Sequence, residues 1–202
     1  MDKYELLTDN FFKRETLKTA KDLLGKVLVK NNGKKGILSG KIVETEAYIG
    51  EHDPACHAFQ KTSGRSSVLY EEGGTIYVYF IYGNYYCFNV VTEKKGTGSA
   101  VLIRAVEPLE GIGQMKLNRP GIKSIHDLTN GPSKMCMAFG IGREFNNTRL
   151  SAKGIFISEP LGEEKLKIAV SKRIGIVKGA ELPYRFFIKD NPYVTKHKFN
   201  KI

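Results

Sequence analysis

Residues 42–48 read Ile42-Val43-Glu44-Thr45-Glu46-Ala47-Tyr48, and His57 follows nine residues later. Valine, isoleucine, threonine and tyrosine favour strands, so residues 41–48 are predicted to form a strand that runs into a loop at Gly50. Because side chains alternate between the two faces of a strand, one face carries Ile42, Glu44, Glu46 and Tyr48. Two carboxylates and a phenol therefore share a face.

This polar face has two interpretations. A carboxylate beside a second carboxylate, partly shielded from water, can be tuned towards neutral pH and can hold a water molecule as a general base. Alternatively, both glutamates are solvated on an exposed face, as most glutamates are. The segment from Glu51 to His57 favours the first interpretation, because it is a polar loop at a strand end, where functional sites are common.

Length and composition indicate one compact globular protein. The 202 residues suit a single domain, and a hydrophobic content of 41% is enough for a core. No apolar run approaches the roughly 20 residues needed to cross a bilayer. Residues 1–5 lack the basic and then apolar layout of a signal peptide, so we expect an intracellular protein without a membrane segment.

The charge balance indicates a polyanionic partner. The chain has 32 Lys and Arg against 21 Asp and Glu, a net charge of +11, and nucleic acid is the leading candidate. A solvated, lysine-rich surface without a partner is the alternative. The cysteines are odd in number and far apart, which argues against a disulfide framework and against a zinc or iron–sulfur signature. We expect three reduced thiols, Cys56, Cys87 and Cys136.

Short strands joined by tight turns predict antiparallel pairing within one α+β domain. Residues 16–24 have the apolar spacing of a helix, with Thr16 as a possible N-cap. Further helices are expected over 108–117 and 130–139, and the basic residues 196–201 are expected to form a loose tail. Strands are expected over 26–30, 41–48, 100–106, 154–158, 165–170 and 185–189.

The most aromatic stretch, residues 75–91, is predicted to form two strands joined at a turn at residues 82–84. Alternation places Tyr77 and Tyr79 on one face and leaves Tyr82 at the turn, where its ring can protrude. Three tyrosines near one turn suit a platform on which nucleic-acid bases stack. Tyrosines are also common in half-buried strands, so packing in the core is the alternative.

Two further places suggest charged contacts. Arg104 lies among apolar residues of the strand predicted over 100–106, and a charge there needs an acidic partner or a phosphate. Ser133 and Lys134 lie at the start of the helix predicted over 130–139, where backbone N–H groups can bind phosphate. Ordinary helix capping explains the same residues equally well.

Four motifs carry a resemblance to a known family. They are Val43-Glu-Thr-Glu-Ala-Tyr48 with His57, the aromatic residues 75–84, residues 102–111 and Asn130-Gly-Pro-Ser-Lys134. Taken in order, they closely resemble the alkyladenine DNA glycosylases, also called 3-methyladenine DNA glycosylases. The resemblance runs from about residue 13 to residue 194, and four motifs in register are far more specific than a single Glu-Ala-Tyr.

The resemblance implies one domain over residues 1–202, with a core at about 13–194 in which helices flank a curved, mostly antiparallel sheet. It implies hydrolysis of the N-glycosidic bond of alkylated or deaminated purines flipped out of duplex DNA, such as 3-methyladenine, 7-methylguanine, hypoxanthine and ethenoadenine. We expect no metal, no other cofactor and no obligate protein partner, and a monomer. The matched motifs place no lysine as a Schiff-base nucleophile, so the abasic strand should stay intact.

The resemblance also implies roles for individual residues. Glu46 matches the general base for the attacking water, and Arg104 matches a residue that supports this water. Tyr82 matches the side chain that intercalates into the gap left by the flipped nucleotide. The positions that match family residues in contact with the flipped base are Tyr48, His57, Tyr79 and Asn89. The backbone at Ile174 and Gly175 matches the segment that meets the sugar and the water. Contacts with DNA phosphates are expected from Arg65, Ser133 and Lys134.

Two other classes of protein fit parts of the sequence. A metal-dependent nuclease could use carboxylates and imidazoles that lie this close together as ligands of two metal ions. Its candidate ligands are Glu44, Glu46, His52, Asp53 and His57. In a non-catalytic nucleic-acid-binding module, the tyrosines at positions 79 and 82 would stack on bases without any chemistry.

Overall fold

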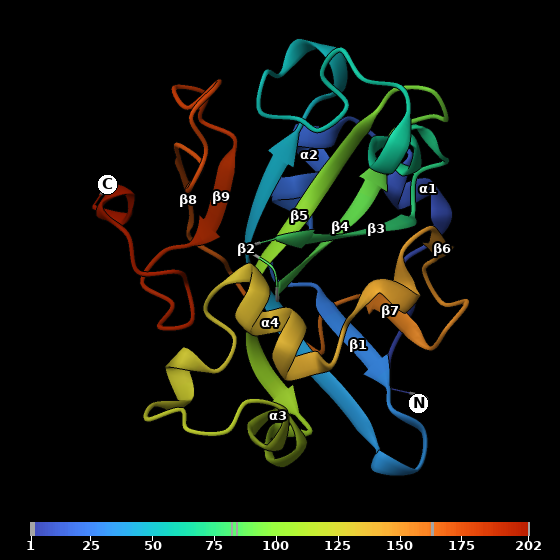
Figure 1. Ribbon diagram of the computed structural model, residues 1–202. Helices are drawn as coiled ribbons and strands as arrows, with labels where there is room; N and C mark the ends of the chain where they lie inside the picture. Colours follow the sequence, from blue (N-terminus) through green and yellow to red (C-terminus); the bar gives the residue numbers. More distant parts are fainter. Residues whose placement is uncertain (1–2, 82, 84, 163, 202) are drawn as a thin grey trace.

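The computed structural model describes residues 3–81, 83, 85–162 and 164–201. These residues form a single curved antiparallel sheet with helices packed against it, which confirms the predicted α+β class (Figure 1). The described strands are β1 (Val27–Asn31), β2 (Ile37–Tyr48), β3 (Thr75–Ile81), β4 (Tyr85–Thr92), β5 (Ser99–Glu110), β6 (Thr148–Arg149), β7 (Ile155–Ser158), β8 (Ile168–Ser171) and β9 (Arg185–Ile188). The described α-helices are α1 (Asp9–Phe12), α2 (Thr16–Asp22), α3 (Ile112–Asn118) and α4 (Pro132–Phe139).

Strand β2 is the centre of the sheet. The strand order is β6-β3-β4-β5-β2-β1-β7, and β9 pairs with both β2 and β8. Along one edge β2 pairs with β5, and along the other it pairs first with β1 and then, from Glu44 onward, with β9. The register with β5 shifts on both sides of Glu44. Such irregularities bend a strand, so β1 and β9, which pair with different parts of β2, extend from it in different directions (Figure 1).

Both faces of β2 are covered by protein. Ile42, Val43 and Ala47 have no exposed area. The Thr45 hydroxyl donates a hydrogen bond to the Ala20 carbonyl at 2.8 Å, which ties α2 to the strand. Helix α2 packs behind the sheet on β2 and β5, whereas α4 packs in front on β4 and β5 (Figure 1). Polar side chains on β2 therefore need partners inside the protein.

The helix predicted over 108–117 was wrong at its start, because β5 continues to Glu110 and α3 begins only at Ile112. Pairing of β5 with β2 continues to the end of the strand and outweighs the helical spacing of the apolar residues. The chain changes direction at Gly111, which has a φ of +73° and would, with a side chain, meet the Ile37 carbonyl oxygen at 2.5 Å.

The expected loose tail over residues 196–201 was also wrong. Residues Lys198–Asn200 form a short 3-10 helix, η6, and Asn200 hydrogen-bonds to Arg185 of β9 and to the Thr195 carbonyl. In Figure 1 this segment lies on the side of the molecule where β8 and β9 are found. The basic pattern of the sequence suggested solvation, but the contacts are made by a threonine backbone and an asparagine.

The three cysteines are buried free thiols, as expected. Burial is the main reason that the pKa of the Cys56 thiol is raised to about 11, which keeps it protonated. Among the residues that the structure describes, no helix is long and apolar enough to cross a membrane.

Candidate active site

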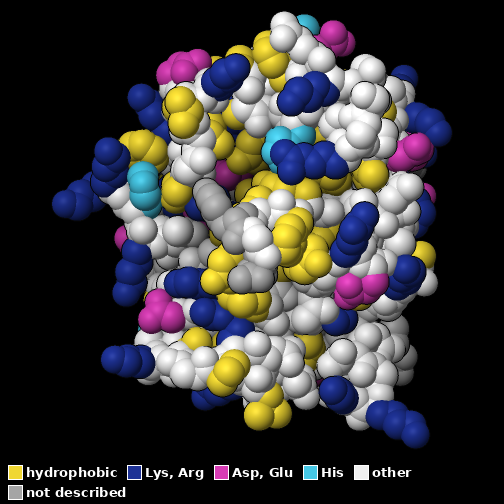
Figure 2. Space-filling view, viewed as in Figure 1, with side chains coloured by type: hydrophobic (Ala, Val, Ile, Leu, Met, Phe, Trp, Pro, Cys, Tyr) yellow, Lys and Arg dark blue, Asp and Glu magenta, His cyan; other side chains and the backbone are white. Residues whose placement is uncertain are grey.

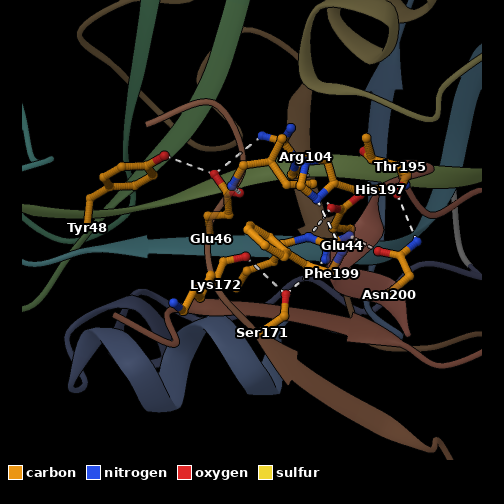
Figure 3. A network of polar contacts seen from close by, with 12 residues as sticks. Glu44, Glu46, Tyr48, Arg104, Ser171, Lys172, Thr195, His197, Phe199 and Asn200 are labelled. Atoms are coloured by element: carbon orange, nitrogen blue, oxygen red, sulfur yellow. Dashed lines mark hydrogen bonds and ion pairs between the residues drawn. The ribbon is translucent and has the colours of Figure 1, made fainter. Parts of the chain in front are cut away.

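Glu46 on β2 has no exposed area, yet its carboxylate binds three donors. Its Oε2 accepts hydrogen bonds from the Tyr48 hydroxyl at 2.9 Å and from Arg104 Nη1 at 3.3 Å (Figure 3). Its Oε1 accepts from the Ile174 backbone N–H at 2.8 Å. The predicted shared face of β2 is therefore confirmed, and the alternative of a solvated glutamate is wrong. These donors replace the water that burial removes.

Arg104 on β5 lies between two buried carboxylates. Its Nη1 contacts Glu46 at 3.3 Å, and its Nε lies 3.2 Å from Glu44 Oε1. The sequence predicted either an acidic partner or a phosphate for Arg104, and the structure shows two acidic partners. Burial by itself would lower the pKa of the Arg104 guanidinium, but Glu46 and then Glu44 raise it, so the group stays charged.

The Tyr48 hydroxyl acts as a neutral donor to Glu46. Burial, and then the negative charge of Glu46, raise the pKa of this phenol well above its ordinary value of 10.0. The Arg173 guanidinium lies 4.7 Å from the centre of the Tyr48 ring. This cation–π contact fixes the ring beside the carboxylate.

Sequence analysis missed the ion pair between Asp53 and Arg173. Both side chains are fully buried, and two contacts at 2.5 and 2.7 Å join them in a bidentate arrangement. Arg173 also donates to the Ala47 carbonyl at 2.8 Å. The pair therefore connects the loop after β2 to the segment that carries Ile174. The only signals in the sequence were an aspartate in the His57 loop and an arginine directly before Ile174.

An aromatic pocket adjoins this carboxylate. Tyr48, His57, Tyr77, Tyr79 and Asn89 line a cavity of about 20 Å³, which is room for about one water molecule. The Tyr77 and Tyr79 rings stack with centroids 5.3 Å apart, and the His57 ring meets Tyr79 edge-on at 4.6 Å. The predicted shared face of the two tyrosines is confirmed. A larger ligand needs these rings to move apart.

His57 is neutral at physiological pH. Burial is the main cause of the low pKa of its imidazole, about 4, and the positive charges of Arg65 and Lys61 lower it further. Its Nδ1 lies 2.9 Å from the Tyr77 hydroxyl. Burial raises the pKa of Tyr77 to about 12, so this contact joins two neutral groups.

Asn89 on β4 faces the same pocket with a fixed amide. Its Nδ2 donates to the Tyr77 carbonyl at 3.0 Å and to the Cys87 carbonyl at 3.4 Å. Both amide protons are used within the sheet, so the amide cannot turn without losing them. Asn89 is therefore a rigid wall of the pocket.

Arg65, within the 3-10 helix η3 (Gly64–Tyr70), lies at the pocket rim with two lysines. Together with Lys61 and Lys178 it lines a second cavity of about 450 Å³, which His57 also borders. In the part of the chain that the structure describes, none of these three cations forms an ion pair. On the face shown in Figure 2, lysines and arginines surround an apolar centre and clearly outnumber acidic side chains. This cavity is suited to an anionic ligand.

Ser133 and Lys134 are placed less favourably for phosphate. They lie at the start of α4, but Pro132 removes one backbone donor there, and Lys134 Nζ donates to Asn130 Oδ1 at 2.7 Å. Burial raises the pKa of the Cys87 thiol overall, although Ser133 lowers it slightly. Ser133 and Lys134 do not line the basic cavity. The cations that line it beside Arg65 are Lys61 and Lys178.

Two predicted positions concern the backbone and the β3–β4 turn. Gly175 follows Ile174 with a φ of +77°, and a Cβ built there would meet nothing within 4 Å. The backbone beside Glu46 is therefore open to a close ligand. Tyr82, the predicted intercalating residue, lies outside the described residues, between the end of β3 and the start of β4.

The five candidate ligands of a nuclease are not brought together by the described structure. Each of the three carboxylates is held by an arginine: Glu44 by Arg185, Glu46 by Arg104 and Asp53 by Arg173. His52 is exposed in η2 (Gly50–His52), and His57 binds Tyr77. Among the described residues, no three His, Cys, Asp or Glu side chains are grouped so as to hold a metal ion.

Comparison with known proteins places this geometry in context. The model of the methylpurine-DNA glycosylase family matches residues 10–192. A Francisella tularensis protein named "putative 3-methyladenine DNA glycosylase" is 48% identical over 185 residues, which cover 90% of this chain and 94% of the relative. Relatives with the same name from Chlorobium phaeobacteroides and Clostridium novyi are 44% and 45% identical, over 98% and 94% of this chain and 98% of each relative.

Proposed function

The chain belongs to the methylpurine-DNA glycosylase family, and we propose that it excises alkylated or deaminated purines from duplex DNA by hydrolysis. Family membership makes it a DNA glycosylase that acts on damaged bases in DNA repair. One observation carries the finer proposal. The buried carboxylate of Glu46 accepts hydrogen bonds from Arg104 and from Tyr48, and Tyr48 lines the aromatic pocket.

Glu46 is the proposed general base. Each carboxylate oxygen has two lone pairs, and Oε2 uses both of them to bind Tyr48 and Arg104. Among the described residues, Oε1 accepts a hydrogen bond from the Ile174 N–H alone, which leaves one lone pair for a water molecule. That water attacks the sugar carbon as the base leaves, while Oε1 takes its proton. The same negative charge stabilises the oxocarbenium character that develops on the sugar.

The aromatic pocket is the proposed binding site of the flipped base. Entry of a purine separates the His57 and Tyr79 rings, which now touch edge-on, and places the base between aromatic faces. A neutral imidazole at the wall does not repel a positively charged alkylated purine, and tyrosine faces attract it. The Asn89 side chain is fixed by two hydrogen bonds, so it limits which groups the bound base can carry on the edge that faces it. Tyr82 is proposed as the wedge that fills the vacated stack.

The basic cavity beside His57 is the proposed binding site of DNA phosphates. Arg65, Lys61 and Lys178 border it without an acidic competitor among its lining residues. Phosphates of the strand whose base has entered the pocket pass this rim. None of the described residues that line the aromatic pocket is a lysine, so the proposed product is an intact abasic strand. We propose that one copy of the protein acts alone on duplex DNA.

Removing Arg65 is expected to weaken binding to every duplex, damaged or not. Arg65→Ala removes one phosphate contact, so the slope of log affinity against log salt becomes smaller by about 0.9. Fluorescence anisotropy across a salt series measures this slope. Lys34→Ala is the matched control, because Lys34 is an exposed cation in η1 (Gly33–Lys35), away from the cavity. Equal slopes for the parent and Arg65→Ala would exclude this residue as a phosphate contact.

The proposed activity is tested by product analysis. The protein is incubated in EDTA with duplexes that carry hypoxanthine, 3-methyladenine or ethenoadenine, and the products are separated by chromatography. We expect free base and an uncleaved, alkali-labile strand. Nicked strands that appear only without chelator would indicate the metal-dependent nuclease. Tight binding without release of base would indicate a non-catalytic module.

A further inference from the structure

In the segment of residues 195–200, Thr195, His197, Phe199 and Asn200 lie around Glu44 (Figure 3). Glu44 forms a buried ion pair with Arg185. The Thr195 backbone N–H donates to Glu44 Oε2 at 2.9 Å. Asn200 Oδ1 accepts a hydrogen bond from Arg185 Nη2 at 2.9 Å, and its Nδ2 donates to the Thr195 carbonyl at 3.0 Å. The segment therefore holds both members of the pair.

These contacts lie at one end of a row of four buried side chains with alternating charges. The neighbours in the row are separated by 2.5, 3.2 and 3.3 Å, in the order Arg185, Glu44, Arg104 and Glu46. All four side chains are buried, and the two positive charges balance the two negative charges. A buried charge without its partner strongly destabilises the folded protein. If Arg185 moves, each neighbouring side chain in the row therefore changes its contacts to keep a partner.

The position of Arg104 decides how Glu46 is held. Arg104 Nε lies 3.2 Å from Glu44 without a hydrogen bond to it, and the one hydrogen bond from Arg104 to Glu46 among the described residues comes from Nη1. A guanidinium prefers a bidentate contact with a carboxylate. Released from Glu44, Arg104 would turn onto Glu46 and cover the lone pair that the attacking water needs.

We propose that residues 195–200 are a positioning element for the excision reaction; this inference rests on the proposed function. The Thr195 backbone holds Glu44, and Asn200 holds both Arg185, the ion-pair partner of Glu44, and the Thr195 carbonyl. Glu44 in turn keeps Arg104 from a bidentate contact with Glu46. The segment lines neither the aromatic pocket nor the basic cavity. Loss of its contacts therefore slows the chemical step and leaves DNA binding unchanged.

The test compares Asn200→Ala, Asn200→Asp and Thr195→Ala. Asn200→Ala should lower the single-turnover excision rate at saturating enzyme by about tenfold, with an unchanged dissociation constant for damaged duplex. Asn200→Asp keeps an acceptor for Arg185 and should recover most of the rate. Thr195→Ala is the matched control, because its backbone N–H remains and its hydroxyl has no hydrogen-bond partner among the described residues.

A signal that does not depend on activity accompanies the rates. The Arg104 Nε–H resonance in a nitrogen-15 spectrum of the whole protein should move in Asn200→Ala and stay in place in Thr195→Ala. A parent that releases no base overturns the proposed function, whatever the spectra show. An unmoved Arg104 signal, an unchanged rate for Asn200→Ala, or an equal loss of rate in Thr195→Ala overturns the positioning role.

Discussion

Replacement of Glu46 by glutamine is expected to lower the rate of base excision by at least ~10²-fold, the low end for the loss of a general base. Glutamine keeps the shape of the side chain, and its single amide oxygen can still accept either from Tyr48 and Arg104 or from the Ile174 N–H, but not from both sides. It cannot take a proton from water, and it offers no negative charge to the sugar. The single-turnover rate at saturating enzyme reports this loss directly.

Binding to damaged duplex should survive in Glu46→Gln, because the aromatic pocket and the basic cavity are untouched. Glu51→Gln is the matched control: it makes the same chemical change at an exposed position in η2, near the site. If Glu46→Gln excised bases at the parent rate, the general base would lie elsewhere. Glu44, on the same strand, would then be the first candidate.

Asp53→Ala should lower the free energy of unfolding by about 3–5 kcal/mol, the range for breaking a buried ion pair from one side. Asp53 and Arg173 are both fully buried, and the substitution leaves the Arg173 guanidinium charged and without its carboxylate. Chemical denaturation of the parent and the variant measures the difference.

Two further variants make the Asp53 result specific. Asp22→Ala breaks the partly exposed pair with Arg14 and should cost at most about 1 kcal/mol. Adding Arg173→Met to Asp53→Ala removes the stranded charge and should restore part of the stability. Equal stability of Asp53→Ala and the parent would show that the pair contributes nothing to the fold.

Local patterns in the sequence were sufficient to predict the polar face of β2. Alternation along a strand depends only on neighbouring residues, so Glu46 and Tyr48 could be placed together without knowledge of the fold. The same logic placed Tyr77 beside Tyr79 in β3. The need of Arg104 for an acidic partner or a phosphate followed from its apolar neighbours, although the choice between the two and the identity of the partner did not.

The errors arose where distant segments meet. Pairing with β2 kept Pro108 in a strand against the helical spacing around it, and no local pattern reports such pairing. The Asp53–Arg173 and Glu44–Arg185 pairs join residues 120 and 141 positions apart. Residues 196–201 were misjudged for the same reason, since the partners of this segment lie on β2 and β9.

The account is tested most directly by the pH dependence of excision from a duplex that carries 7-methylguanine. Alkylation at N7 makes this base cationic, so it leaves without being protonated, and protonation of the leaving base adds nothing to the pH dependence of the rate. Single-turnover rates of the parent should fall by about tenfold per pH unit along an acid limb, because a general base that already carries a proton cannot take one from water. Glu46→Gln should show a slow rate without that limb. An acid limb of the same shape in both proteins would contradict the account and assign the titrating group to another residue, such as His57.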